Sequence, residues 1–344
     1  MDLRRLVASA LGVPLSFTVA AASLAQPASA GPAAGRAVAT VAANPSVRLQ
    51  ELVEEAQLRL APPKIPAGTL PTTLLKLSDK QRYAILVDLP RARLYVLENT
   101  GGSFKLVHEQ YAAMGRNGVG KQSRGDLRTP IGIYTITGFI TDEALPEKYG
   151  SGAFPLNYPN IWDRHHGRDG SGIWLHGIDR AMASRAPRSS EGCVTMANSD
   201  LLALKPYLQQ GRTPVVLADS VSWMAPAIVQ RERDTLLARI EDWRARWSAI
   251  DTEAYLDFYA DDFVSGGMGK AAFSAHKRRV NASKRRIEVQ LHDLDLIRYP
   301  GEPDLVLAQF RQDYRSDNFS ATGTKQQFWR LQKDGSWKIV LEES

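Results

Sequence analysis

The sequence predicts a mostly β domain, a sandwich or barrel with short helices, followed by an α+β domain. Short apolar segments separated by Gly- and Pro-containing turns run through residues 81–220, as is typical of a mostly β architecture. Residues 221–344 differ, because helical segments come first and alternating strands follow. The length of 344 residues is enough for about two domains.

Residues 1–30 have the features of a secretory signal peptide. Arg4 and Arg5 precede an interrupted apolar stretch that ends near Leu24, and Ala28-Ser29-Ala30 offers a cleavage site. A transmembrane helix is the alternative, but the interruption and the cleavage site argue against it. We therefore expect export to the periplasm or the cell envelope.

Residues 31–80 are expected to be an N-terminal linker with one helix. Val47–Leu60 has apolar residues at helical spacing, and Pro62 and Pro63 terminate the pattern. The apolar stripe consists of Leu49, Leu52, Val53, Ala56 and Leu60. Such a helix can bind a partner, although packing on its own domain is the commoner outcome. Residues 64–73 are expected to be linker.

The central domain, residues 81–220, is predicted to open with a β-hairpin. The apolar segments 84–89 and 93–97 are separated only by Pro90-Arg91-Ala92. Further strands are expected at residues 104–107, 109–114, 132–137, 172–175 and 214–217.

A helix near the end of this domain is predicted over residues 199–210. Asn198 or Ser199 is its expected N-cap, and Pro206 is expected to kink or break it. Residues 224–226 mark the boundary to the next domain.

Residues 221–344 are predicted to form helices followed by a curved antiparallel sheet. Helices are expected over 227–249 and 251–263, and strands over 287–291, 305–310, 325–331 and 337–341. The segments Trp243–Phe263 and Asp334–Val340 resemble the nuclear-transport-factor-2-like (SnoaL-type) fold, a cone, over roughly residues 228–344. No acid/base pair is evident on the strands. We therefore expect this domain to bind an envelope protein, a glycan or a second copy of the chain as a homodimer.

The net charge of +6 includes two basic runs, Lys277–Arg279 and Lys284–Arg286. Such runs can bind nucleic acid, contact acidic envelope polymers or simply be solvated. Because export is expected, we do not expect nucleic acid as a partner.

The only cysteine of the chain, Cys193, follows His176 by 17 positions. Ile173–Leu175 is apolar enough to be a buried strand, which places His176 at its end. A thiol is a strong nucleophile as thiolate, and a nearby imidazole commonly provides the base. Gly192 would let the backbone amides of Gly192 and Cys193 donate to an oxyanion. The alternative is a small buried hydrophobe beside a core histidine.

Three segments of the chain resemble the L,D-transpeptidases of the YkuD type, cysteine enzymes of the bacterial cell wall. These segments are Gly125–Tyr134, Phe154–Asn160 and the paired motif His176-Gly177 with Ser190–Met196. The three motifs agree with the family in order and spacing over roughly residues 82–218.

The resemblance implies that the Cys193 thioester carries an acyl group from a peptidoglycan stem peptide, without a cofactor. His176 would be the base and then the acid, Gly177 would orient it, and Gly192 would help to hold the oxyanion. The substrate-binding residues would include Asn157, Tyr158, Ser190 and Thr195.

Two departures from the family pattern bear on the fate of the acyl group. Thr195 stands where many members have an arginine, and Glu191 precedes Gly192. A negative charge there would attract an amine acceptor but oppose thiolate formation. Transfer to an amine is the prediction, with hydrolysis, by carboxypeptidase or amidase action, as the alternative.

A zinc-dependent envelope peptidase would use His165, His166 and His176. Adjacent histidines in an extended segment tend to point apart, so no metal is expected. A non-catalytic envelope-binding module is the remaining alternative.

Overall fold

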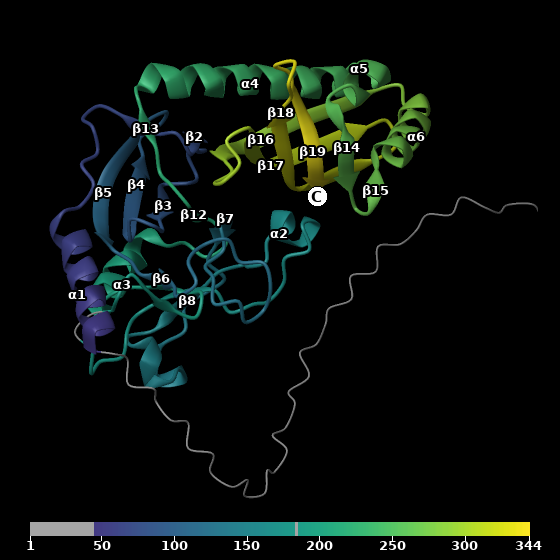
Figure 1. Cartoon of the computed structure of the whole chain (residues 1–344). Coiled ribbons are helices and arrows are strands. Elements are labelled where there is room, and N and C mark those ends of the chain that lie inside the picture. Colours follow the sequence, from purple (N-terminus) through teal and green to yellow (C-terminus); the bar gives the residue numbers. More distant parts are fainter. Residues whose placement is uncertain (1–44, 183–184) are drawn as a thin grey trace, which may run out of the picture. The chain divides into compact units, whose positions relative to one another are not determined.

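A mixed five-stranded sheet lies at the centre of the first domain in the computed structural model, which describes residues 45–182 and 185–344 (Figure 1). Its order is β5 (Phe104–Tyr111), β4 (Arg93–Asn99), β3 (Tyr83–Asp88), β12 (Pro214–Ala218) and β7 (Gly132–Thr135). The predicted hairpin is confirmed as β3 and β4, whereas residues 104–111 form one strand instead of two. The expected signal peptide lies outside the described residues.

Both faces of this sheet are buried, because its strands are apolar at consecutive positions. Ile85 and Val87 point into the core of the first domain, while Ala84 and Leu86 belong to a second cluster that contains Leu307 of the C-terminal domain. The C-terminal domain therefore covers the second face of the sheet.

Smaller strands and short helices complete the first domain. They are β6 (Met114–Gly115), β8 (Ala153–Pro155), β9 (Trp174–His176), β10 (Arg188–Ser190), β11 (Val194–Thr195), α2 (Ile161–His165), α3 (Asn198–Leu204) and the 3₁₀ turns η1 (Asp142–Ala144), η2 (Glu147–Tyr149) and η3 (Lys205–Tyr207). The α-helix predicted over 199–210 gives way to a 3₁₀ turn at Pro206, since proline lacks the N–H that continues an α-helix.

Helix α1 (Pro45–Leu60) is confirmed, but its apolar stripe faces solvent. Leu49 is 63% exposed and Leu60 is 84% exposed. The helix instead packs through Leu58, and its last carbonyls accept hydrogen bonds from the guanidinium of Arg93. Arg59 lies 4.0 Å from the centroid of the Tyr111 ring. Polar contacts at its C-terminal end, and not the stripe, attach the helix to the first domain.

The segment expected to be a linker contributes two short strands. β1 (Leu70–Pro71) pairs with β13 (Trp223–Met224), and β2 (Leu74–Lys76) pairs with β16 (Ile287–Arg298) of the C-terminal sheet. The C-terminal sheet thus takes an edge strand from residues that precede the central domain.

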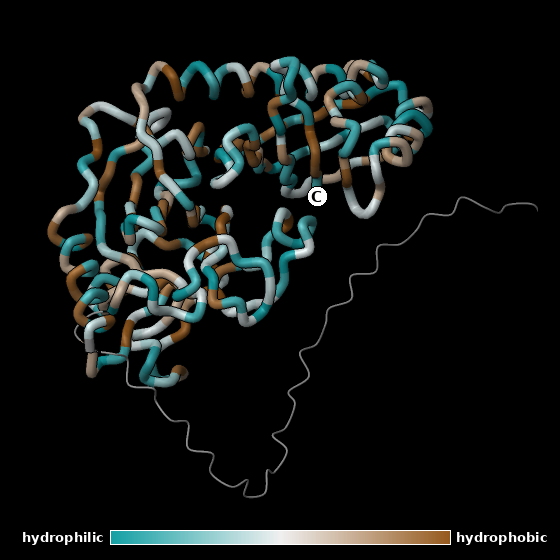
Figure 2. The backbone as a smooth tube through the Cα atoms, in the orientation of Figure 1, coloured by the Kyte–Doolittle hydropathy of each residue, from teal (hydrophilic) through white to brown (hydrophobic). Residues whose placement is uncertain are grey.

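The C-terminal domain is a seven-stranded sheet with helices on one side (Figure 1). Its order is β15 (Met268–Gly269), β14 (Tyr259–Ser265), β19 (Trp337–Glu343), β18 (Ser320–Leu331), β17 (Leu305–Ser316), β16 (Ile287–Arg298) and β2, and its helices are α4 (Pro226–Ser248), α5 (Thr252–Leu256) and α6 (Lys270–Ala282). The helix predicted over 251–263 is wrong beyond Leu256, because residues 259–265 form β14. Within the described residues, no helix is long and apolar enough to cross a bilayer, and polar residues recur along α4 (Figure 2).

The contact between the two domains includes aromatic and polar side chains. Trp162 stacks on Phe328 with 5.0 Å between ring centroids, and its indole N–H donates to Glu302 at 2.8 Å. Asn160 Nδ2 donates to the Tyr299 hydroxyl at 3.1 Å. The motif at residues 154–160 therefore leads directly into this contact.

Candidate active site

The pairing of two short strands brings His176 and Cys193 together. β9 and β11 are parallel, with Leu175 opposite Val194 and His176 opposite Thr195. Cys193 immediately precedes β11, so it lies at the level of Trp174, the first residue of β9. Both residues line one cavity of about 110 Å³, whose other lining residues are Arg116, Lys148, Tyr149, Arg185, Ser190 and Glu191.

The imidazole of His176 is held in one orientation. Its Nδ1 lies 2.6 Å from the carbonyl oxygen of Gly177, and the ring of Tyr149 packs edge-on at 4.8 Å between centroids. Because a carbonyl can only accept, Nδ1 carries the hydrogen and Nε2 has a free lone pair. The pKa of His176 is lowered to about 4, chiefly by burial; the hydrogen bond to Gly177 opposes this shift, while Arg185 and Lys148 add to it. His176 is therefore a neutral base at neutral pH.

The thiol of Cys193 is also neutral at rest. Its Sγ donates to the carbonyl oxygen of Gly172 at 3.3 Å. Burial raises the pKa of Cys193 to about 11, although the backbone N–H of Trp174 and the Arg185 guanidinium act in the opposite direction. The resting pair is thus thiol and imidazole, so an attack by this sulfur would need a base that takes its proton.

The turn that presents Cys193 requires a glycine at position 192. Gly192 has φ +123°, and an added Cβ would lie 2.8 Å from the carbonyl oxygen of Arg128. Ser190 Oγ donates to the carbonyl oxygen of Cys193 at 2.5 Å and accepts from the Gly192 amide at 3.1 Å. The Ser190 hydroxyl therefore closes the turn. It also accepts a hydrogen bond from the Gly192 amide, one of the two amides expected to bind an oxyanion.

Asn198 fixes the loop that holds the Gly177 carbonyl. Its Oδ1 accepts from the amides of Ser151 at 2.9 Å and Ile178 at 3.3 Å, and its Nδ2 donates to the Ile178 carbonyl at 2.8 Å. A Cβ on Gly177 would lie 2.1 Å from Oδ1. The predicted N-cap, Asn198 or Ser199, is wrong, because Ala197 is the N-cap of α3. The Asn198 side chain bonds to these loops instead.

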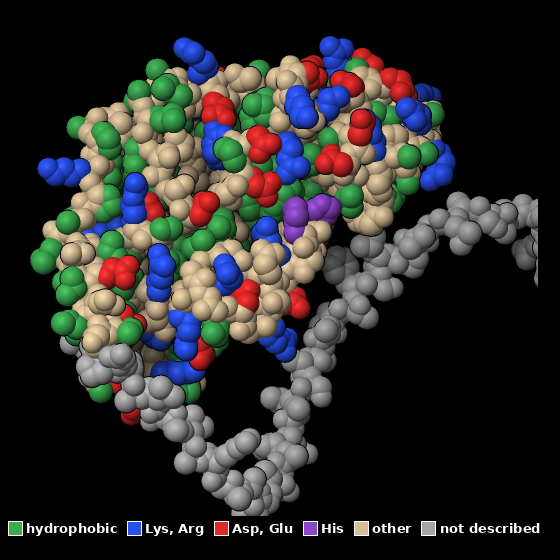
Figure 3. Space-filling model, viewed as in Figure 1, with side chains coloured by type: hydrophobic (Ala, Val, Ile, Leu, Met, Phe, Trp, Pro, Cys, Tyr) green, Lys and Arg blue, Asp and Glu red, His purple; other side chains and the backbone are tan. Residues whose placement is uncertain are grey.

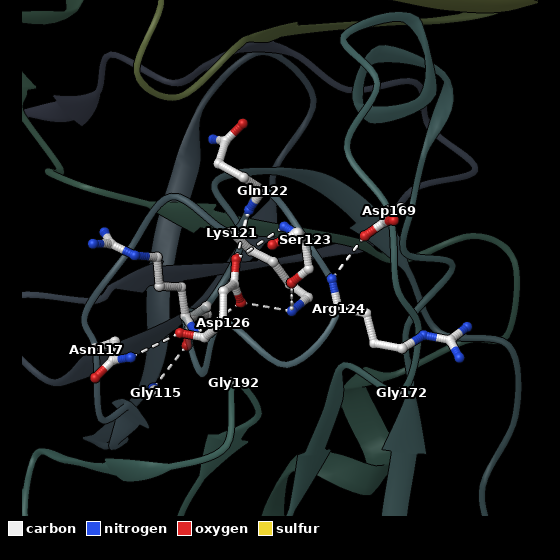
Figure 4. A network of polar contacts seen from close by, with 12 residues as sticks. Gly115, Asn117, Lys121, Gln122, Ser123, Arg124, Asp126, Asp169, Gly172 and Gly192 are labelled. Carbon is white, nitrogen blue, oxygen red and sulfur yellow. Dashed lines mark hydrogen bonds and ion pairs between the residues drawn. The ribbon is translucent and has the colours of Figure 1, made fainter.

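A network of hydrogen bonds around Asp126 fixes the loop that packs against the turn carrying Cys193 (Figure 4). The carboxylate accepts from Lys121 Nζ at 2.7 Å and from the amides of Gln122, Ser123 and Arg128. Burial alone would raise the pKa of Asp126, but Lys121 and the amides outweigh it and hold the pKa at about 2. The loop fixed in this way places the Arg128 carbonyl against Gly192.

The predicted substrate-binding residues lie in different places. Ser190 lines the cavity with Cys193, whereas Thr195 is fully buried with an unpaired hydroxyl. Tyr158 is buried and donates to the carbonyl of Asp169, and Asn157 accepts from the Thr135 amide and lines another cavity.

The histidines of the zinc alternative are not brought together with His176. His166 Nδ1 bonds to the carbonyl of Trp162, and both His165 and His166 pack against the Trp162 ring. Over residues 45–182 and 185–344, no group of three His, Cys, Asp or Glu side chains is arranged to hold a metal ion.

Sequence reasoning missed the residues that complete the cavity wall. These residues come from two loops and the 3₁₀ turn η2, none with apolar periodicity, so no pattern linked them to Cys193; they are Arg116, Lys148, Tyr149 and Arg185. The basic residues at 185 and 188 shortly before the Ser190 turn were the one available signal.

Comparison with known proteins places the chain in a family. Residues 82–217 match the L,D-transpeptidase catalytic domain, YkuD, and residues 235–343 match the Cds6 C-terminal NTF2-like domain. Bd1075 of Bdellovibrio bacteriovorus is 31% identical in sequence; the alignment covers 80% of this chain and 97% of that one, with a TM-score of 0.70. The chain belongs to the L,D-transpeptidase family. The resemblance and the fold class expected from the sequence are thereby confirmed.

The fold is also similar to that of a second solved structure. Pgp2, a helical cell shape determining protein of Campylobacter jejuni, is 23% identical, with 86% of this chain and 99% of that chain covered and a TM-score of 0.67. No curated protein sequence matches the chain. The two-domain arrangement is therefore shared with solved structures over nearly the whole of their length.

Proposed function

We propose that this protein is an exported cysteine L,D-transpeptidase that cleaves a peptidoglycan stem peptide between an L- and a D-centre. The observation that supports this best is that Cys193 and His176 line one cavity, with His176 Nδ1 held by the Gly177 carbonyl. Family membership supports peptidoglycan as the substrate class.

Thioester formation begins with the neutral pair. The thiol turns from the Gly172 carbonyl toward His176 Nε2, which takes its proton as Sγ attacks the scissile carbonyl carbon. The amides of Cys193 and Gly192 then donate to the oxyanion, which requires Gly192 to release Ser190 Oγ. Imidazolium returns the proton to the departing amine, and the C–N bond breaks to leave the thioester.

The acceptor determines the product. An amine acceptor would give a 3→3 crosslink or attach a protein to peptidoglycan, as the sequence suggested through Glu191. Glu191, however, lies 3.8 Å from Arg116, so its charge is partly offset, and Arg185 and Lys148 line the same cavity. These cations oppose the approach of an ammonium group, so hydrolysis is a second candidate.

The C-terminal domain is proposed to bind an envelope partner, a glycan or a second copy of the chain. Basic and acidic side chains are interspersed on the face shown in Figure 3, which suits a solvated surface better than nucleic acid. The shared fold with Pgp2 suggests a role in cell shape, in the periplasm or cell envelope.

The acceptor is tested by mass spectrometry of purified muropeptides after incubation with the enzyme, with the Cys193→Ala variant as control. New crosslinked dimers support transfer to an amine. Shortened stem peptides without dimers, even with amine acceptors in excess, support hydrolysis. Equal product profiles for the wild type and Cys193→Ala would refute the cysteine mechanism.

A further inference from the structure

The wall of the catalytic cavity carries more positive charge than the chemistry at Cys193 requires. Arg116 follows β6, Lys148 lies in η2 and Arg185 precedes β10, yet all three line the cavity that holds Cys193 and His176. The one carboxylate on this wall is Glu191. It pairs with Arg116 at 3.8 Å, and both of these side chains are at least half exposed.

Arg185 and Lys148 have no carboxylate partner in the part of the chain that the structure describes. The guanidinium of Arg185 is nevertheless fixed along one edge, because Nε donates to Ser189 Oγ and Nη2 donates to the Ser189 carbonyl, both at 3.0 Å. Ser189 Oγ in turn donates to the carbonyl of Ala186 at 2.7 Å. An arginine has five N–H donors, so the remaining ones are pre-oriented for a planar anion.

Lys148 is placed beside the base. Its Nζ lies 5.1 Å from the centroid of the Tyr149 ring, which packs edge-on against His176. Lys148 and Arg185 also line a second cavity of about 260 Å³, whose other charged residues are Arg48, Glu51 and Asp179. The two cations therefore stand where the catalytic cavity meets a neighbouring one.

The presence of Arg185 and Lys148 is not explained by a need to activate the thiol. They favour the thiolate, but burial outweighs them and Cys193 stays protonated at rest. They also oppose the imidazolium that forms when His176 accepts the proton. Two cations without an ion-pair partner, close to a base that must become positively charged, are unfavourable to the chemistry unless the substrate brings a negative charge.

We propose that Arg185, assisted by Lys148, binds the free carboxylate of the residue that leaves from the stem peptide. The inference rests on the proposed function and names the residues that select the stem peptide that donates the acyl group. A carboxylate one residue beyond the scissile carbonyl would reach the cavity wall and pair bidentately with the guanidinium. Arg185 thus supplies, from another loop, a cation in place of the arginine that many family members have at the position of Thr195.

The test compares two synthetic stem peptides that differ only in ending as a carboxylate or as a carboxamide. Full-length wild-type enzyme should prefer the carboxylate by about 10- to 100-fold in kcat/KM, the range of a charge-assisted hydrogen-bonded pair. Arg185→Gln should remove most of that preference and leave turnover of the carboxamide within about threefold. Arg185→Lys should retain part of the preference, because the positive charge remains but the planar guanidinium that binds a carboxylate through two N–H groups does not.

Arg188→Gln is the matched control, because Arg188 is exposed on β10 and does not line the cavity. It should keep the wild-type preference. Two results would overturn the inference while leaving Cys193-dependent turnover intact. One is a wild-type enzyme with equal kcat/KM for the two peptides. The other is an Arg185→Gln variant whose kcat/KM falls equally for both peptides at an unchanged melting temperature. Failure of wild type to process either peptide would overturn the proposed function and the inference with it.

Discussion

Replacement of Gly177 by alanine tests how the imidazole of His176, the proposed general base, is held. The new Cβ would lie 2.1 Å from Asn198 Oδ1. It would also lie 3.1 Å from both the backbone nitrogen of Ser151 and the backbone carbonyl oxygen of Tyr149. Asn198 must therefore move and give up its hydrogen bonds to Ser151 and Ile178. At about 1 kcal/mol for each of these bonds, the free energy of unfolding should fall by about 2 to 4 kcal/mol.

The assay is a double-mutant cycle on urea unfolding and on kcat. Asn198→Ala alone loses the same hydrogen bonds, so the double variant with Gly177→Ala should be little worse than Asn198→Ala. A coupling free energy of at least about 1.5 kcal/mol is expected. Gly138→Ala is the control, because nothing lies within 4 Å of its added Cβ. Additive losses, or a Gly177→Ala variant with wild-type stability and kcat, would refute this account of the loop.

Three further predictions concern the base, the supporting loop and the domain contact. Because burial lowers the pKa of His176 from 6.5 to about 4, kcat/KM should stay level as pH falls through 6.5 and decline only toward pH 4; an acid limb near 6.5 would contradict this. Asp126→Asn should lower kcat by about tenfold with little change in KM, since a displaced Lys121–Asp126 loop misplaces the nucleophile; steady-state kinetics with unchanged kcat would argue against that role. Trp162→Ala should lower the free energy of unfolding by about 3 to 5 kcal/mol, measured in urea, because it leaves a cavity against Phe328; a loss below about 1 kcal/mol would contradict the packing.

The sequence was most informative where one local pattern decides the structure. The hairpin of residues 84–97 follows from two apolar segments and a short turn, and the motifs around His176 and Cys193 identify the family. The apolar stripe of α1 misled, because spacing shows that a helix has two faces but not which one the rest of the fold covers. Residues 259–263 misled for a different reason, since pairing with β19 outweighs their local helical pattern.

The rest of the site depends on contacts between distant segments. Asn198 is 21 positions from Gly177, and the cations at 116, 148 and 185 meet only because the strands are paired as they are. The apolar residues on the second face of the five-stranded sheet predict a cover, but only the structure shows that the C-terminal domain provides it.

The intact mass of the enzyme after rapid mixing with a stem peptide tests the central claim most directly. The wild type should gain the mass of the peptide minus its leaving residue, and fragmentation should place the addition on Cys193. Cys193→Ala should gain nothing while it keeps the wild-type melting temperature. Turnover of the peptide by Cys193→Ala, or an acyl group found on another residue, would contradict the account.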